Sequence, residues 1–170
     1  MLLCLCGTAF GQGSGIWLDV PFVHQQKNGC GAAVIAMLME YWQKQQPRDN
    51  DPTVDPAEIQ RGLYSRKAHG IYAADLEDYL KQRGFRTFTV QGDWELLHHH
   101  LEKGRPLIVA LKPIRGESEL HYVMVVGLDS QNNVILINDP AQRKLLKVER
   151  AGFEREWKAV GRWTLLAVPR

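Results

Sequence analysis

Apolar residues follow one another almost without a break from Ala32 to Trp42, in the first third of the chain. Most of them are good helix formers, and a helix that is apolar on nearly every side is typical of the interior of a domain. The pattern therefore predicts a central buried helix that begins at Cys30. We expect three more helices after it, a short one starting at 55–58 and two over 72–83 and 93–103.

Beyond residue 104 the pattern changes to short apolar runs, which predict strands. Alternation of apolar and polar residues predicts one further strand before this point, over 85–90. Because most helices come first and most strands second, the order favours an α+β domain with an antiparallel sheet over a doubly wound fold. In the expected fold the central buried helix, in the N-terminal group of helices, packs on a C-terminal antiparallel sheet. The runs that predict this sheet are 106–111, 121–128, 134–137, 144–148 and 163–168.

Length, charge and apolar content limit the classes of function. The chain has 170 residues, enough for one domain with a single core, and a net charge of +2 with acidic and basic residues interspersed. No run of Lys or Arg exceeds a pair, so neither nucleic acid nor an anionic membrane surface is indicated as a partner. No apolar stretch reaches the roughly 18 residues of a membrane-spanning helix, so we expect no integral membrane span in the mature chain.

The first eleven residues, 1–11, are mostly apolar or small and form a possible signal peptide. Ala9 and Gly11 place small residues at the two positions that a signal peptidase reads, and cleavage would fall before Gln12. The segment is short and lacks a basic start, so an ordinary apolar N-terminus is the alternative. With the signal, we expect an exported protein, either periplasmic or extracellular.

Removal of this segment would take away Cys4 and Cys6 and leave Cys30 as the only thiol of the mature chain. A single cysteine cannot form an internal disulfide, and no Cys-x-x-Cys pair is present to hold structural zinc. We expect neither a metal nor a cofactor. Unpartnered N–H groups and the helix dipole at the start of a helix stabilise a thiolate, so Cys30 is a candidate nucleophile. A buried structural cysteine is the alternative.

A histidine and an acidic residue occur in the strand half of the chain. His121 opens one predicted strand, and Asp139 follows the next strand, across a hairpin turn. If Leu128 pairs with Val134, His121 and Asp139 project from the same face as diagonal neighbours, about 7–8 Å apart at the backbone. A register shifted by one residue would separate them, and Asn138 would then face the histidine.

A thiol, an imidazole and a carboxylate together form a set that catalyses acyl transfer. The imidazole takes the proton of the thiol, the carboxylate orients the ring, and the thiolate attacks a carbonyl carbon. The developing oxyanion needs donors, which the Cys30 backbone N–H and the side-chain amide of Gln25 or Gln26 can supply. Each residue taken alone also has a structural interpretation, as a histidine at a strand end, an Asp-Pro turn or a loop glutamine.

Four short blocks of sequence accompany these candidates. They are Val20-Pro21-Phe22-Val23-His24-Gln25, Cys30-Gly31-Ala32-Ala33, His121-Tyr122-Val123-Met124-Val125-Val126-Gly127 and Asn138-Asp139-Pro140. Together they resemble the bacteriocin-processing, double-glycine cysteine peptidases, which are papain-like. The resemblance implies a papain-like domain over 18–168. It also implies the roles of Cys30 as nucleophile, His121 as general base and acid, Asp139 as orienting carboxylate and Gln25 as oxyanion-hole donor.

Many members of that family are fused to an ABC exporter, and this chain resembles instead the stand-alone, exported relatives. The function implied is a cysteine peptidase that hydrolyses a peptide bond through a Cys30 thioester, with a peptide or protein as its substrate. Two alternatives stay open. The same residues can perform another acyl transfer, of the amidase or transglutaminase kind, or the chain is a catalytically silent peptide-binding domain of the same fold.

Overall fold

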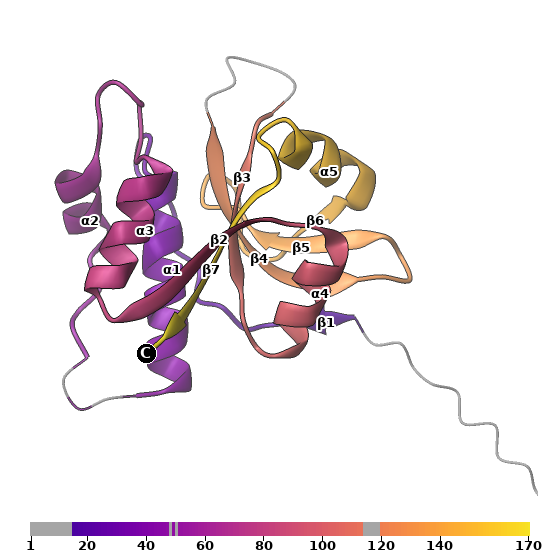
Figure 1. The fold of residues 1–170 in the computed structure, drawn as a ribbon, viewed down its shortest axis with the longest axis horizontal. Helices are drawn as coiled ribbons and strands as arrows, with labels where there is room; N and C mark the ends of the chain where they lie inside the picture. Colours follow the sequence, from indigo (N-terminus) through magenta and orange to yellow (C-terminus); the bar gives the residue numbers. More distant parts are fainter. Residues whose placement is uncertain (1–14, 48, 50, 114–119) are drawn as a thin grey trace, which may run out of the picture.

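The structure is a computed structural model that describes residues 15–47, 49, 51–113 and 120–170. The possible signal peptide at 1–11, with Cys4 and Cys6, lies outside these residues. The helices within them are α1 (Cys30–Gln45), α2 (Pro56–Leu63), α3 (Ala73–Gln82), α4 (Trp94–Glu102) and α5 (Arg150–Lys158). The strands are β1 (Ile16–Trp17), β2 (Phe85–Gln91), β3 (Leu107–Leu111), β4 (His121–Asp129), β5 (Val134–Asn138), β6 (Leu146–Glu149) and β7 (Trp163–Pro169). Figure 1 shows their arrangement.

The strands form one antiparallel sheet, in the order β2-β7-β3-β4-β5-β6, with β1 paired to β4. The predicted α+β fold with an antiparallel sheet is confirmed. Two elements interrupt the order of helices first and strands second. The strand predicted over 85–90 is β2, which lies among the helices, and α5 lies among the strands.

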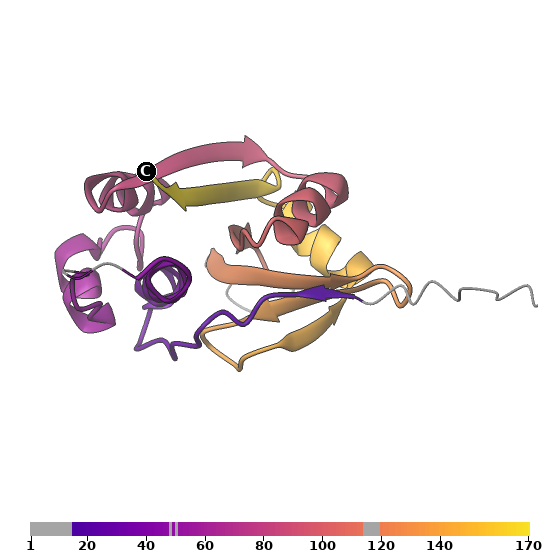
Figure 2. The ribbon, with the colours of Figure 1, turned by 90° about the horizontal axis from the view of Figure 1, so that it is seen from below.

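Helices cover both faces of the sheet. Helices α1 and α3 pack on one face and α4 and α5 on the other, and Figure 2 shows α1 end-on beside the sheet. The sequence pattern did not predict which face of the sheet α4 covers. The helix buries Leu97 and Leu101, and such an apolar stripe can pack equally well on either face of a sheet. The central strands are therefore buried on both sides, with Met124 facing α1 and Val123 facing the opposite layer.

Helix α1 is the predicted central helix. Its residues from Gly31 to Met39 are all buried, together with Tyr41. The helix contacts β4, α2 and α3, which surround it and explain why almost every one of its faces is apolar. None of the helices in the described residues is both long and apolar enough to cross a bilayer.

The hairpin of β4 and β5 starts in a different register from the predicted one. Leu128 pairs with Ile135 rather than with Val134. A β-bulge then shifts the register by one residue between Val125 and Gly127. The prediction was wrong at the turn because a bulge inserts an extra residue that apolar alternation does not reveal.

The bulge restores the predicted pairing at the other end of the hairpin. Met124 pairs with Asn138, as the predicted register requires. Because side chains alternate between faces, the next position, Asp139, then lies on the same face as His121. The bulge therefore cancels the register error of the turn at the end of the hairpin where His121 and Asp139 lie.

Candidate active site

Cys30 is the first residue of α1 and is half-buried. The residue before it, Gly29, supplies no side chain to cap the helix, and the first turn contains no acidic residue. The N–H groups of this turn are therefore available to a ligand, and the positive end of the helix dipole lies beside the sulfur. This position provides a backbone donor for an oxyanion.

His121 and Asp139 form the central ion pair of the candidate site. The His121 Nε2 atom lies 2.8 Å from the Asp139 Oδ1 atom, and the two side chains are 20% and 5% exposed. A short, shielded contact of this kind fixes the plane of the imidazole ring. Since Nε2 is engaged by the carboxylate, Nδ1 is the ring nitrogen left to exchange a proton with the thiol.

Two neighbours hold the Asp139 carboxylate in place. The Ala141 backbone N–H donates to Oδ1 over 2.9 Å, and the Gln142 side chain donates from Nε2 to Oδ2 over 2.6 Å. Gln142 was not among the residues predicted from the sequence. A signal was present, because the side chain of an Asp that opens a turn commonly bonds groups two or three residues later.

The electrostatics of the site favour a charged imidazole. Burial on its own would lower the pKa of His121, but the hydrogen bond to Asp139 and the interaction with Cys30 outweigh it and raise the pKa to about 9. Burial would likewise raise the pKa of Asp139, yet the contact with His121 dominates and lowers it. At neutral pH the pair is therefore an imidazolium and a carboxylate.

Gln25 and Gln26 lie in different pockets. Gln25 borders the same pocket as Cys30 and His121, and its backbone N–H donates to the Pro140 carbonyl oxygen over 2.9 Å. Its Oε1 atom is buried and has no hydrogen-bond partner among the described residues. Gln26 is exposed and borders a neighbouring pocket. Of the two glutamines, the structure thus brings Gln25 to Cys30.

Asn138, the alternative partner for the histidine, is fully buried and holds the backbone instead. Its Nδ2 atom donates to the carbonyl oxygens of Val20 at 3.2 Å and Pro21 at 3.4 Å. Its Oδ1 atom accepts from the Leu145 N–H at 3.0 Å. These bonds tie the segment that leads to Gln25 onto β5, so Asn138 supports the site without taking part in its ion pair.

We expect Asn138→Ala to lower the free energy of unfolding by about 2–4 kcal/mol, because the buried backbone groups that it binds would lose their partners. Urea unfolding followed by circular dichroism measures the change. Gln131→Ala, at an exposed position in the β4–β5 turn, is the control and should shift the free energy by less than about 0.5 kcal/mol. Equal stabilities of the two variants would contradict a supporting role for Asn138.

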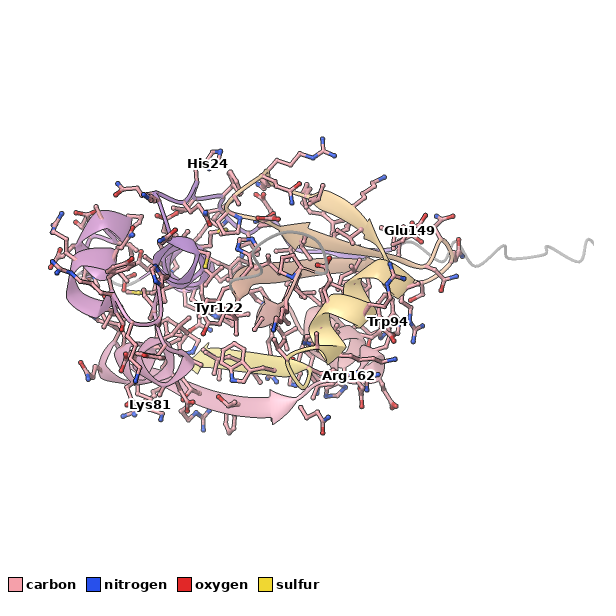
Figure 3. The ribbon with its side chains drawn as sticks, turned by 90° about the horizontal axis from the view of Figure 1, so that it is seen from above. His24, Lys81, Trp94, Tyr122, Glu149 and Arg162 are labelled. Atoms are coloured by element: carbon pink, nitrogen blue, oxygen red, sulfur yellow. The ribbon has the colours of Figure 1, made fainter. Side chains whose placement is uncertain are left out.

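A pocket of about 420 Å³ opens beside Cys30 and His121. One wall is the segment 68–73, which approaches α1 closely because Gly31 lacks a side chain: a Cβ there would lie 3.0 Å from the Ile71 Cβ. Two large side chains at the pocket, Tyr72 and Leu120, are 44% and 45% exposed. Figure 3 shows Tyr122 reaching the interior and His24 at the surface. The site is therefore open to a ligand with apolar side chains.

The sequence matches the model of the Peptidase_C39 like family over residues 17–165. No curated protein gives a significant match. Among solved structures, a C39-like peptidase from Bacillus anthracis has 20% sequence identity to this chain and a TM-score of 0.72, covering 92% of this chain and 98% of its own.

Two further solved structures share the fold. A double glycine motif protease from an AMS/PCAT transporter, in complex with the leader peptide, has 20% identity and a TM-score of 0.67, covering 92% of this chain and 98% of its own. The peptidase domain of Streptococcus ComA, a bi-functional ABC transporter of a quorum-sensing pathway, has 24% identity and a TM-score of 0.66, covering 88% and 98%. At these identities the likeness shows the fold.

Proposed function

The chain belongs to the Peptidase_C39 like family, and on that premise we propose that it is a cysteine peptidase that cleaves a peptide bond through a thioester on Cys30. The observation that carries the proposal is the order of contacts at the site. Cys30 is the first residue of the buried helix α1, and its thiol interacts with the His121 ring. On the other side of this ring, the Nε2 atom lies 2.8 Å from the Asp139 Oδ1 atom.

In the proposed reaction, the Cys30 proton has already passed to Nδ1 of His121 in the resting enzyme, and the thiolate attacks the carbonyl carbon of the scissile bond. The negative charge on the carbonyl oxygen is stabilised by the Cys30 backbone N–H and by the Gln25 side-chain amide. His121 then gives its proton to the leaving amine, and the C–N bond breaks to leave a thioester. Water, deprotonated by His121, hydrolyses the thioester and restores the thiol. Asp139 keeps the ring oriented throughout.

The substrate we propose is a peptide or protein segment. The pocket beside Cys30 is open and has the exposed apolar side chains Tyr72 and Leu120 at its border, which suits the side chains of an extended peptide. The double glycine motif protease of similar fold was solved with a leader peptide bound. This likeness supports a peptide ligand for the present chain.

Alkylation by iodoacetamide tests the proposal, because it reports the thiolate directly. We expect rapid modification of Cys30 at pH 7 and much slower modification in His121→Ala. Slow alkylation that sets in only above pH 8 would favour a catalytically silent binding domain.

Mass spectrometry of peptides incubated with the protein identifies the reaction. New free termini indicate hydrolysis, whereas products joined to an added amine would indicate a transferase.

We expect the rate of cleavage to fall as the pH rises through about 9, where His121 loses its proton, because the leaving amine then lacks a proton donor. Asp139→Asn removes a main cause of the raised pKa of His121. The variant should retain residual activity, and the alkaline limb of its kcat/KM profile should move to lower pH. Asp78→Asn, at an exposed position on α3, is the control. An unshifted limb would contradict the role of Asp139.

The same pKa has a consequence for stability. The pKa of about 9 in the folded chain lies above the 6.5 of an ordinary histidine, so protonated His121 favours the folded state. This contribution is complete below pH 6.5 and is lost as the pH rises through about 9.

A further inference from the structure

A group of basic side chains lies next to the pocket of Cys30. We call Lys27, Arg61, Arg66 and Lys67 the basic rim. Lys27 lies in the segment that leads to Cys30, Arg61 lies in α2, and the other two lie in the turn that Ser65 and Gly70 close by pairing. All four are exposed, and none forms an ion pair within the described part of the chain.

The positive charge of the basic rim is local. The segments 24–30 and 59–72 contain no Asp or Glu, whereas the whole chain has 19 acidic and 21 basic residues. The nearest carboxylate on α2, that of Glu58, lies three residues before Arg61 and borders a second pocket together with Arg61, Tyr79 and Arg83. Glu58 forms no ion pair with Arg61 in the described part of the chain, so the basic rim keeps a positive charge that attracts anionic groups.

Two members of the basic rim, Arg61 and Arg66, border a pocket of about 490 Å³. Its residues are Gln26, Ala57, Gln60, Arg61, Tyr64 and Arg66. The Gln60 Nε2 atom donates to the Lys27 carbonyl oxygen over 2.8 Å, which joins α2 to the segment before Cys30. Two guanidinium groups, amides and a phenol in one hollow are the donors that a carboxylate requires.

This basic pocket adjoins the pocket of Cys30. Gln25 borders the pocket of Cys30, and the next residue, Gln26, borders the basic pocket. The two pockets are therefore adjacent along the backbone at these residues. The Asn28 Nδ2 atom lies 3.5 Å from the Tyr64 hydroxyl, and these two side chains also border one pocket each. An extended peptide that passes Cys30 can therefore continue into the basic pocket.

We infer that the basic rim recognises an acidic segment of the substrate, with an Asp or Glu within roughly six residues of the cleaved bond, given about 3.3 Å per extended residue. The inference rests on the proposed peptidase function and adds a substrate class to it. Arginine binds a carboxylate through two parallel hydrogen bonds, which gives geometric selectivity as well as attraction. A carboxylate on a flexible side chain reaches into a hollow more readily than a planar lipid surface does.

Binding to an inactive full chain tests the inference without cleavage. The probe is a labelled twelve-residue peptide with four glutamates, compared with the same peptide carrying glutamines, and binding to Cys30→Ala is followed by fluorescence anisotropy. We expect the glutamate peptide to bind about five- to tenfold more tightly at 50 mM salt, with the difference reduced at 500 mM salt. Adding Arg61→Gln and Arg66→Gln should abolish the preference.

The matched control carries Arg86→Gln and Arg170→Gln, which remove the same charge from exposed positions at β2 and the chain end and should keep the preference. Equal binding of both peptides overturns the inference, as does tighter binding to vesicles of phosphatidylcholine and phosphatidylglycerol than to the glutamate peptide.

A cleavage assay distinguishes failure of the proposed role of the basic rim from failure of the proposed peptidase function. If the wild type cuts peptides with no preference for acidic ones, the basic rim has no such role. If acidic peptides bind but none is cut, only the peptidase proposal fails.

Discussion

Replacing Cys30 by alanine is expected to abolish peptide cleavage, with a loss of about ten-thousand-fold or more, because no other described side chain at the site is positioned to form a thioester. Cys30 is the first residue of α1 and is only half-buried, so its replacement by the smaller alanine disturbs little packing. Initial rates on a peptide that the wild type cleaves measure the loss.

The fold of Cys30→Ala serves as the control for that loss. We expect its circular dichroism spectrum to match the wild type and its free energy of unfolding to change by less than about 1 kcal/mol, as for a substitution outside the core. Cys30→Ser is the second control, since a hydroxyl keeps the shape of the thiol but is a far weaker nucleophile. Cleavage at the wild-type rate in either variant would refute Cys30 as nucleophile.

His121→Ala is expected to reduce cleavage by about a thousand- to ten-thousand-fold, because the same ring activates the thiol and protonates the leaving amine. The substitution should also remove the rapid alkylation of Cys30 at neutral pH, which ties the loss to the thiol itself. The two effects are measured on one preparation of the variant. The value of kcat/KM measures the loss of cleavage, and the rate of iodoacetamide labelling measures the loss of thiol reactivity.

The matched control for His121→Ala is His98→Ala. His98 is a partly exposed histidine on α4, where its Nδ1 atom lies 3.5 Å from the Glu102 carboxylate, and it does not border the pocket of Cys30 and His121. We expect this variant to cleave and to label as the wild type does. If His121→Ala kept rapid labelling, the imidazole would not be the base, and the order of contacts at the site would have a purely structural meaning.

Much of the architecture could be predicted from local pattern. The buried helix from Cys30 was predicted because its apolar residues leave no polar face, and an Asp cap followed by Pro marked the start of α2. The apolar runs of β3 and β4 indicated central strands. The positions of α4 and α5 could not be predicted, because an amphipathic helix shows that it has a buried face but not which layer covers that face.

The site residues divide in the same way. Residue type and order along the chain were enough to nominate Cys30, His121 and Asp139 as candidates. Only the structure shows that His121 contacts Asp139 and not Asn138, because the contact follows from a bulge in β4 that leaves no periodic signal. Only the structure shows that Gln25, and not Gln26, borders the pocket of Cys30. The contact of Gln142 with the carboxylate became visible only in three dimensions.

Helix and strand periodicity and side-chain chemistry are local properties, so most elements and the chemical groups of this protein could be predicted from its sequence. Which of these groups come into contact depends on the folded chain. It brings Arg61 and Arg66 of the basic rim to a pocket that adjoins the Cys30 pocket, and it places His121 beside a thiol and a carboxylate from separate segments of the chain. Such meetings depend on register and packing between distant segments, which no single stretch of sequence encodes.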